Sequence, residues 1–215
     1  MTKEEQKVIY KCIKELSKAK GWKFNNHFIF KNENDFFYNC NLYMHPNDNS
    51  ISVSLRFKPM VIDDLFWEIT ELEDNKKLPL SHRAKAAFQI NGYRIVVSEI
   101  LLSNIVNCEN EITNLLKSID DNVSKIVVSV TDIEQYLNYI SKENNPDYNA
   151  IITCLIHMKD FTIAKEKISY CRLNEINSLY QFGEDDFYDM AEKYINKNEI
   201  KEKLPFNWKK LFSKN

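Results

Sequence analysis

Residues 51–58 alternate strictly between apolar and polar side chains, and no other pattern in the chain constrains the fold as strongly. The apolar set is Ile51, Val53, Leu55 and Phe57, and the polar set is Ser52, Ser54, Arg56 and Lys58. Successive side chains of a β-strand point to opposite faces of a sheet. This period of two therefore predicts a strand with one buried face and one face in water.

Turn-forming clusters divide the segment before this strand. Asn32–Asp35 and His45–Ser50 are rich in Asn, Asp and Pro, which favour tight turns. The aromatic and β-branched residues around these clusters predict strands at Phe28–Phe30 and Phe36–Met44. We therefore expect an antiparallel meander, which Pro59 closes.

Two more elements are predicted after Pro59. Apolar residues recur at helical spacing in Val61–Leu72, which predicts a short helix. The dipeptide Asn91-Gly92 favours the positive φ angles of a tight hairpin turn. We expect the two strands of that hairpin at Ala84–Ile90 and Tyr93–Glu99.

Helical spacing dominates both ends of the chain. Thr2 and Glu5 form a capping-box pattern before an N-terminal helix, and Thr131 and Glu134 repeat the pattern farther along. The remaining predicted helices are an apolar stripe from Ile112 to Val127, a hairpin of Tyr148–Met158 and Phe161–Cys171 with Asp160 as its N-cap, Glu184–Ile195, and Glu199–Leu204.

These patterns together predict an α+β fold. An N-terminal helix and a mainly antiparallel β-sheet occupy residues 1–105, and a helical C-terminal half occupies residues 106–215. A chain of 215 residues is long enough to bury a core without disulfides or metals, and we expect one compact unit.

Composition excludes several classes of function. The chain has 3 glycines, where average usage would give about 15. Phosphate-binding loops need closely spaced glycines, so the P-loop and dinucleotide fingerprints are absent and no cofactor is expected. The net charge is −2, without the basic balance of nucleic-acid binders, so direct nucleic-acid binding is not expected.

Cysteine usage and hydropathy indicate the compartment. The five cysteines are odd in number, widely spread and without CxxC pairs, which argues for buried free thiols in a reducing compartment. No stretch approaches the roughly 20 apolar residues that cross a bilayer, and the charged N-terminus lacks a signal-peptide pattern. We therefore predict a cytoplasmic protein without membrane contact.

Two Cys–His pairs are candidates for a metal site or a nucleophilic site. Cys154 and His157 lie three residues apart on a predicted helix and would face one metal ion, but nothing nearby supplies two further zinc ligands. Cys40 and His45 bracket a strand end, where a nucleophilic pair is one interpretation. Packed cysteines with hydrogen-bonded histidines explain both pairs more simply, so no metal or catalytic residue is assigned.

A dense acidic run follows the meander. It comprises Asp63, Asp64, Glu68, Glu71, Glu73 and Asp74. The simplest interpretation is a solvated helix face. A second is an acidic patch for a basic protein partner. A third is a metal site for hydrolysis, built on Asp63, Asp64 and Glu68.

Two other groups have weaker functional interpretations. Glu184, Asp185 and Asp186 are acids that stabilise the positive end of a helix dipole. Tyr136, Tyr139 and Tyr148 are candidate interface anchors, since tyrosine is enriched at interfaces.

The stretch from Trp22 to Ile90 carries a family resemblance. It combines aromatic-rich strands with FKPMVIDDLFWEI (residues 57–69) and LPLSHRAKAAF (residues 78–88). This combination resembles small bacterial immunity proteins encoded beside toxins of polymorphic or contact-dependent growth inhibition systems. The resemblance covers about a third of the chain and implies a protein that binds a cognate toxin domain and occludes it, without catalysis.

The leading hypothesis is therefore an immunity-type inhibitor. Its predicted partner is a toxin domain, basic if it is a nuclease. The predicted contact residues are Asp63, Asp64, Glu71, Glu73 and Asp74. A small metal-dependent hydrolase or nuclease and a helical protein-binding adaptor are the alternatives.

Overall fold

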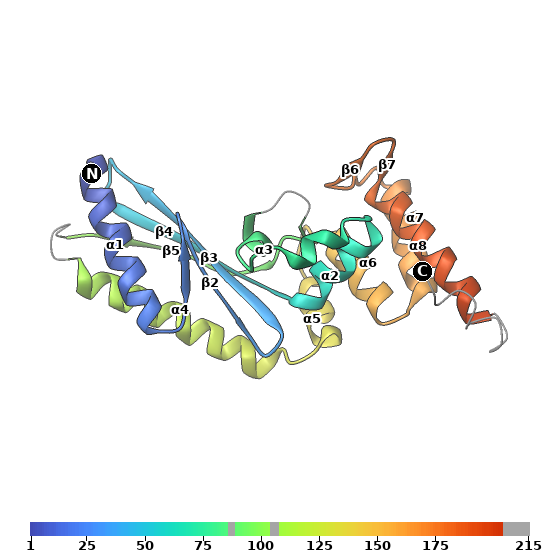
Figure 1. The fold of residues 1–215 in the computed structure, drawn as a ribbon, viewed down its shortest axis with the longest axis horizontal. Coiled ribbons are helices and arrows are strands. Elements are labelled where there is room, and N and C mark those ends of the chain that lie inside the picture. The colour runs from blue at the N-terminus through green and yellow to red at the C-terminus, as the bar shows by residue number, and fades with distance from the viewer. Residues whose placement is uncertain (86–88, 104–107, 204–215) are drawn as a thin grey trace. The chain divides into compact units, whose positions relative to one another are not determined.

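The computed structural model describes residues 1–85, 89–103 and 108–203, and the chain divides into two compact units (Figure 1). The sheet unit comprises Met1–Val61, Pro79–Ala87 and Asn91–Tyr136. The helical unit comprises Ile62–Leu78, Phe88–Ile90 and Leu137–Asn215. The fold class is α+β, as the sequence predicts.

Each of the two units has its own set of helices and strands. The sheet unit holds α1 (Lys3–Ala19), β1 (Lys23–Asn25), β2 (Phe28–Glu33), β3 (Phe36–His45), β4 (Ser50–Pro59), α3 (His82–Lys85), β5 (Tyr93–Leu101) and α4 (Glu109–Ser129). The helical unit holds most of α2 (Met60–Ile69), the 3₁₀ helix η1 (Glu73–Lys77), the second half of α5 (Ile133–Ile140), α6 (Tyr148–His157), α7 (Phe161–Leu173), β6 (Gln181–Phe182), β7 (Asp185–Asp186) and α8 (Phe187–Lys203).

The five strands β1 to β5 form one antiparallel meander in chain order. The turn between β2 and β3 is Asn34-Asp35, and both residues have positive φ, 50° and 64°. Such angles define the tight hairpin turns that usually contain glycine. Asn and Asp tolerate this conformation better than other non-glycine residues, which explains how a glycine-poor chain turns so sharply.

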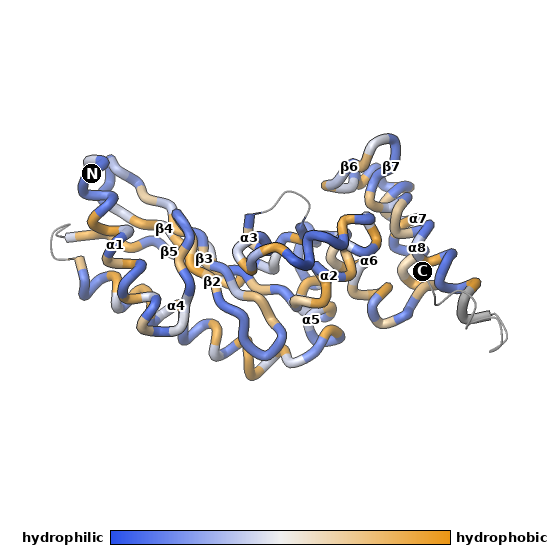
Figure 2. Tube along the Cα trace, in the orientation of Figure 1, coloured by the Kyte–Doolittle hydropathy of each residue, from blue (hydrophilic) through white to orange (hydrophobic). Residues whose placement is uncertain are grey.

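One face of the sheet packs against helices. Tyr10 of α1 contacts Phe24 of β1 at 6.1 Å between ring centroids, and Tyr136 contacts Phe57 of β4 at 5.4 Å. The indole N–H of Trp22 donates to Asp120 of α4 at 2.8 Å. Figure 2 shows the apolar residues of α1 and α4 gathered along these helices. The side chains predicted to be the buried face of β4 lie in this layer.

The opposite face of β4 does not meet water as the alternation predicts. Ser54 is 9 % exposed and Lys58 only 1 %. On the same face, Phe28, Phe30 and Phe37 form a second apolar cluster, against which Met60, Leu80 and Ala84 pack. The sheet is therefore covered on both sides at this end, because the chain after α2 returns across it.

The hairpin predicted at Asn91-Gly92 is wrong. His82–Lys85 is a short helix, Gln89 and Ile90 are not in a strand, and residues 86–88 lie outside the described residues. The strand after the dipeptide is present as β5, and it pairs with β4. A Cβ atom on Gly92 would lie 2.9 Å from the carbonyl oxygen of Phe57, so glycine is required here for close approach to β4.

Helix termini confirm some capping predictions and correct others. The reciprocal Thr2–Glu5 capping box is present. At α5 the capping residue is Asp132 and not the predicted Thr131. The Asp132 carboxylate accepts from the Gln135 N–H at 2.8 Å. Asp160 is the N-cap of α7 but makes no side-chain capping bond.

The C-terminal pattern also forms differently from the prediction. A single helix, α8, replaces the pair Glu184–Ile195 and Glu199–Leu204, and Leu204 lies outside the described residues. The α8 helix begins after Asp186, whose carboxylate accepts from the Asp189 N–H at 3.0 Å, while Asp189 accepts from the Asp186 N–H at 3.1 Å. Of the three acids predicted to act on the helix dipole, Asp186 therefore caps α8 through its side chain.

The boundary between the two units differs from the one predicted from the sequence, which lies between residues 105 and 106. The α4 helix belongs to the sheet unit, because its buried stripe completes the layer with α1. The segment Ile62–Leu78 belongs to the helical unit, because Phe66 stacks on Phe187 of α8 with ring centroids 5.2 Å apart. Among the described residues, every helix is too short or too polar to cross a membrane.

Replacing Gly92 with alanine tests the close approach to β4. We expect Gly92→Ala to lower the free energy of unfolding by roughly 1–3 kcal/mol, because the backbone must shift to accommodate the methyl group. Urea unfolding measures this change. Asn91→Ala is the matched control at an exposed neighbour, and an equal loss in both variants would contradict the packing argument.

Candidate functional site

A charged cleft of about 230 Å³ lies between the end of α2 and α8 in the helical unit. Three carboxylates line one side, from Glu68, Glu71 and Glu73. Lys193 and Lys197 of α8 line the other side, and Ile69, Met190, Tyr194 and Asn198 complete the lining. The cleft therefore combines opposite charges with an apolar floor.

The end of α2 positions the acidic side of the cleft. The Leu72 N–H donates to the Trp67 carbonyl at 2.6 Å, and Glu71 between them has φ of 59°. This is the left-handed turn that ends many helices, where glycine is the usual residue. Trp67 and Ile69 are buried and anchor the turn, so the backbone of Glu71 is held at the rim at a conformational cost of about 1 kcal/mol.

Carboxylates surround Lys193 at the edge of the cleft. Its ammonium group contacts the Asp185 carboxylate at 2.5 Å. The hydrogen bond to Asp185 raises the pKa of Lys193, and the charges of Asp189 and Glu71 add to the effect. The charged form of Lys193 is therefore favoured by its carboxylate neighbours, Asp185 first among them.

Tyr194 connects the two sides of the cleft. Its hydroxyl donates to a Glu68 carboxylate oxygen at 2.9 Å, across 126 residues of sequence. Burial and this hydrogen bond raise the pKa of Tyr194 to about 12, so its hydroxyl remains a donor throughout the physiological range. Lys76 also contacts Glu68, at 3.4 Å, which leaves Glu71 and Glu73 as the acids of the rim without an ion pair to another described residue.

The structure separates the residues of the predicted acidic patch. Glu71 and Glu73 line the cleft. Asp74 is exposed beside it and is paired with Lys77 at 2.7 Å, and Asp64 is half-buried and outside the lining. Two of the five predicted contact residues therefore meet at the cleft.

Asp63 has a different role from the one predicted. Its side chain is fully buried, and its carboxylate accepts a hydrogen bond from the Ile90 N–H at 3.3 Å. The neighbouring Gln89 carbonyl accepts from the Tyr180 hydroxyl. Asp63 therefore holds the returning segment 89–90 inside the helical unit. The prediction that Asp63 is a contact residue is wrong, because its side chain is buried and has a structural role.

The α8 side of the cleft escaped prediction from sequence. Met190, Lys193, Tyr194, Lys197 and Asn198 recur at spacings of three and four, which places them on one helix face. The predicted break between Ile195 and Glu199 concealed this continuous face. The signal was present in the sequence, but its acidic partners lie far away along the chain.

Neither Cys–His pair forms a site. Cys154 is buried, which raises the pKa of its thiol, whereas His157 is exposed. Cys40 and His45 lie an odd number of residues apart on β3 and so point to opposite faces of the sheet. Burial raises the pKa of the Cys40 thiol to about 12, which makes it a poor nucleophile.

The structure also locates the predicted metal ligands and the predicted interface tyrosines. In the part of the chain that the structure describes, no three His, Cys, Asp or Glu side chains are grouped to hold a metal ion, and this includes Asp63, Asp64 and Glu68. Tyr136 is fully buried, while Tyr139 and Tyr148 are half-buried. Of the three candidate interface anchors, Tyr136 is therefore part of the core of the sheet unit.

Charge is distributed unequally between the two units. Residues 62–78 and 137–203 of the helical unit carry 18 acidic and 11 basic side chains. The sheet unit carries 15 basic and 13 acidic side chains. The near-neutral net charge of the whole chain therefore conceals an acidic helical unit.

Comparison of the chain with known protein families, with curated proteins and with solved structures finds no match. The functional argument therefore rests on the residues of the cleft.

Replacing Asp63 separates its structural role from a role in contact. We expect Asp63→Ala to lower the free energy of unfolding by roughly 1–3 kcal/mol, because the buried Ile90 N–H loses its acceptor. Asp63→Asn, which retains an acceptor oxygen, is expected to lose less. Asp74→Ala should leave the unfolding midpoint unchanged, and equal midpoints for Asp63→Ala and Asp74→Ala would contradict the assignment.

Proposed function

We propose that the chain is a non-catalytic, immunity-type inhibitor that binds a basic protein toxin through the cleft of its helical unit. The observation that supports this proposal is the pair of rim carboxylates, Glu71 and Glu73, which line the cleft without an ion pair to another described residue. The unpaired acids are available to a cation from another molecule. The resemblance of residues 22–90 to immunity proteins points the same way.

The size of the cleft favours a protein side chain as the ligand. Small-molecule sites usually enclose about 300–1,000 Å³. A cleft of about 230 Å³ with a charged rim suits one or two side chains from a partner surface instead. An arginine or lysine from a basic partner would reach the rim carboxylates, while its aliphatic stem would cover Ile69 and Met190.

The proposed mechanism is occlusion with charge complementarity. Opposite charges steer two proteins together and fix their register, so they raise the association rate and the specificity. The inhibitor needs no reaction of its own, because covering the active surface of the toxin is sufficient. The excess of acidic side chains across the helical unit extends this attraction beyond the cleft.

Charge reversal at the rim tests the proposal. Affinity capture from lysate of the source organism identifies the partner, whose toxicity is then measured with and without this chain in a growth assay. We expect Glu71→Lys with Glu73→Lys to weaken binding roughly 10-fold or more at low salt, with a smaller difference at high salt because ions screen the attraction.

Glu175→Lys is the matched control for this variant. Glu175 is an exposed glutamate at the end of α7 and has φ of 53°, so Glu175→Lys matches the single change Glu71→Lys in both charge and backbone geometry, and the two single variants are compared beside the double variant. Binding and neutralisation should be unchanged by Glu175→Lys. A partner that binds both variants equally, or a captured partner without toxicity that this chain relieves, would refute the proposal.

Glycine at position 71 is expected to separate stability from binding. Glu71→Gly removes a left-handed glutamate and should raise the free energy of unfolding by roughly 0.5–1 kcal/mol. The same change removes a rim carboxylate and should weaken partner binding. Glu175→Gly should give the stabilisation alone, as measured by urea unfolding and by titration of the partner.

A further inference from the structure

Two cysteines of the sheet unit meet where α1 packs against α4. Cys12 lies on α1 beside Ile9 and Ile13, whose side chains are fully buried, and Cys108 is the N-cap residue of α4. Cys108 is 2 % exposed, whereas Cys12 is half-buried. A hydrogen bond joins the two thiols, and both cysteines are free. The structure therefore shows the reduced form of a facing pair.

Contacts farther along the two helices also place Cys12 beside the start of α4. Lys20, which follows α1, is paired with Asp120 of α4 at 3.0 Å, and the Trp22 indole donates to the same carboxylate at 2.8 Å. Counted back from this contact, Cys12 lies about 12 Å away along α1, and the first turn of α4 lies about 16 Å away along α4. The two helices therefore run side by side in the same direction from the thiol contact to Asp120.

The N-cap position of α4 does not use the Cys108 side chain for capping. Ser, Thr, Asp and Asn are favoured at N-caps because their side-chain oxygens accept from the first free N–H groups of the helix. Cys108 makes no such side-chain hydrogen bond, and its thiol interacts with Cys12 instead. Two thiols in this contact need only a small shift to reach the S–S bond length of about 2.0 Å.

We propose that Cys12 and Cys108 are a redox-modification site, at which a low-molecular-weight disulfide such as oxidised glutathione converts the two thiols to a disulfide between α1 and α4. The Cys12 thiolate, the more exposed of the two, attacks one sulfur of the small disulfide and releases one small thiolate. The Cys108 thiolate then attacks the Cys12 sulfur and expels the second. The two cysteine sulfurs are oxidised and lose their protons to solvent, while the small disulfide is reduced to two thiols. This site belongs to the sheet unit, and its chemistry does not depend on the proposed function.

The environment of the pair makes this reaction slow at neutral pH. Burial raises the pKa of the Cys12 thiol to about 11, and the charges of Cys108 and Glu109 add to the effect. Burial also raises the pKa of the Cys108 thiol. Only a thiolate attacks a disulfide, so the oxidation rate should rise roughly tenfold for each pH unit between about pH 7 and pH 9. The pair therefore responds to sustained oxidation and not to a brief exposure.

Thiol counting in the intact chain tests the proposal. The protein is incubated with oxidised glutathione, denatured and treated with N-ethylmaleimide, and the adducts on its five cysteines are counted by mass spectrometry. We expect two fewer adducts after oxidation, and proteolysis should yield a cross-linked peptide that contains Cys12 and Cys108. The disulfide closes a loop of about 100 residues, so the melting temperature should rise by roughly 5 °C or more and return to its first value on reduction.

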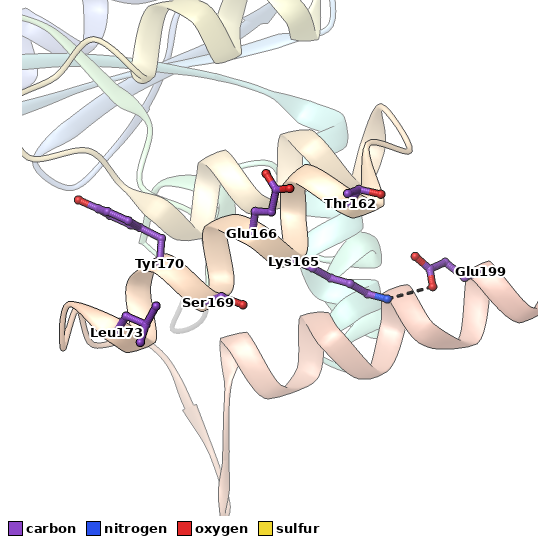
Figure 3. A pocket seen from close by; sticks show the side chains of 7 residues that line it. All are labelled: Thr162, Lys165, Glu166, Ser169, Tyr170, Leu173 and Glu199. Atoms are coloured by element: carbon purple, nitrogen blue, oxygen red, sulfur yellow. Dashed lines mark hydrogen bonds and ion pairs between the residues drawn. The ribbon is translucent and has the colours of Figure 1, made fainter.

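The helical unit provides a matched control. Cys171 of α7 is also buried, but its thiol hydrogen-bonds with Tyr188 of α8, a phenol that cannot form a disulfide. Figure 3, a view of the hollow along α7, shows that the ion pair of Lys165 and Glu199, at 2.9 Å, joins the same two helices. Cys171→Ser should therefore leave the loss of two adducts unchanged, whereas Cys12→Ser should abolish it.

Three results would overturn the proposal, and all are read from the wild-type chain, so a variant that fails to fold leaves the test intact. Five adducts after prolonged oxidation at about pH 9 would show that the thiols do not react. A cross-link between two other cysteines, or between two copies of the chain, would place the reaction elsewhere. A glutathione adduct on Cys12 without a cross-link to Cys108 would show that the two sulfurs do not come within bonding distance.

Discussion

The packing of Phe66 decides where the acidic segment of this protein lies. Its ring is 4.8 Å from Tyr180 and 5.2 Å from Phe187, between ring centroids, so α2 is fixed against α8 and the loop before it. The charged cleft exists because of this contact, since its two sides are otherwise far apart in sequence. The Glu68–Tyr194 hydrogen bond depends on the same arrangement. An aromatic cluster in the core thus positions a polar site at the surface.

Scarcity of glycine shapes the turns of the molecule. Within the described residues, seven other than glycine have positive φ, among them Asn34 and Asp35 in a hairpin turn and Glu71 and Glu175 at helix ends. Asn and Asp adopt this conformation at modest cost, but glutamate gains no local hydrogen bond from it. At Glu71 the left-handed backbone is unfavourable, but the residue brings a carboxylate to the rim of the cleft. The backbone strain at Glu71 is thereby connected to the proposed function.

The two units differ in their electrostatic character, and this difference supports a division of roles. The sheet unit is nearly neutral and covers its sheet with α1, α4 and the chain after α2. The helical unit carries the acidic excess and the charged cleft. In the proposed inhibitor, the charged cleft of the helical unit faces a basic partner.

Local patterns in the sequence determined the α+β class, the meander, the Thr2–Glu5 cap and the hairpin of α6 and α7, because periodicity, turn chemistry and capping act between near neighbours. They also identified Glu71 and Glu73, though only as part of a longer acidic run. Only the tertiary structure decided that Asp63 and Lys58 are buried, that Gly92 serves close packing, and that Lys193 and Tyr194 complete the cleft. Burial and electrostatic environment depend on residues brought together from distant parts of the chain, and no local pattern encodes that proximity.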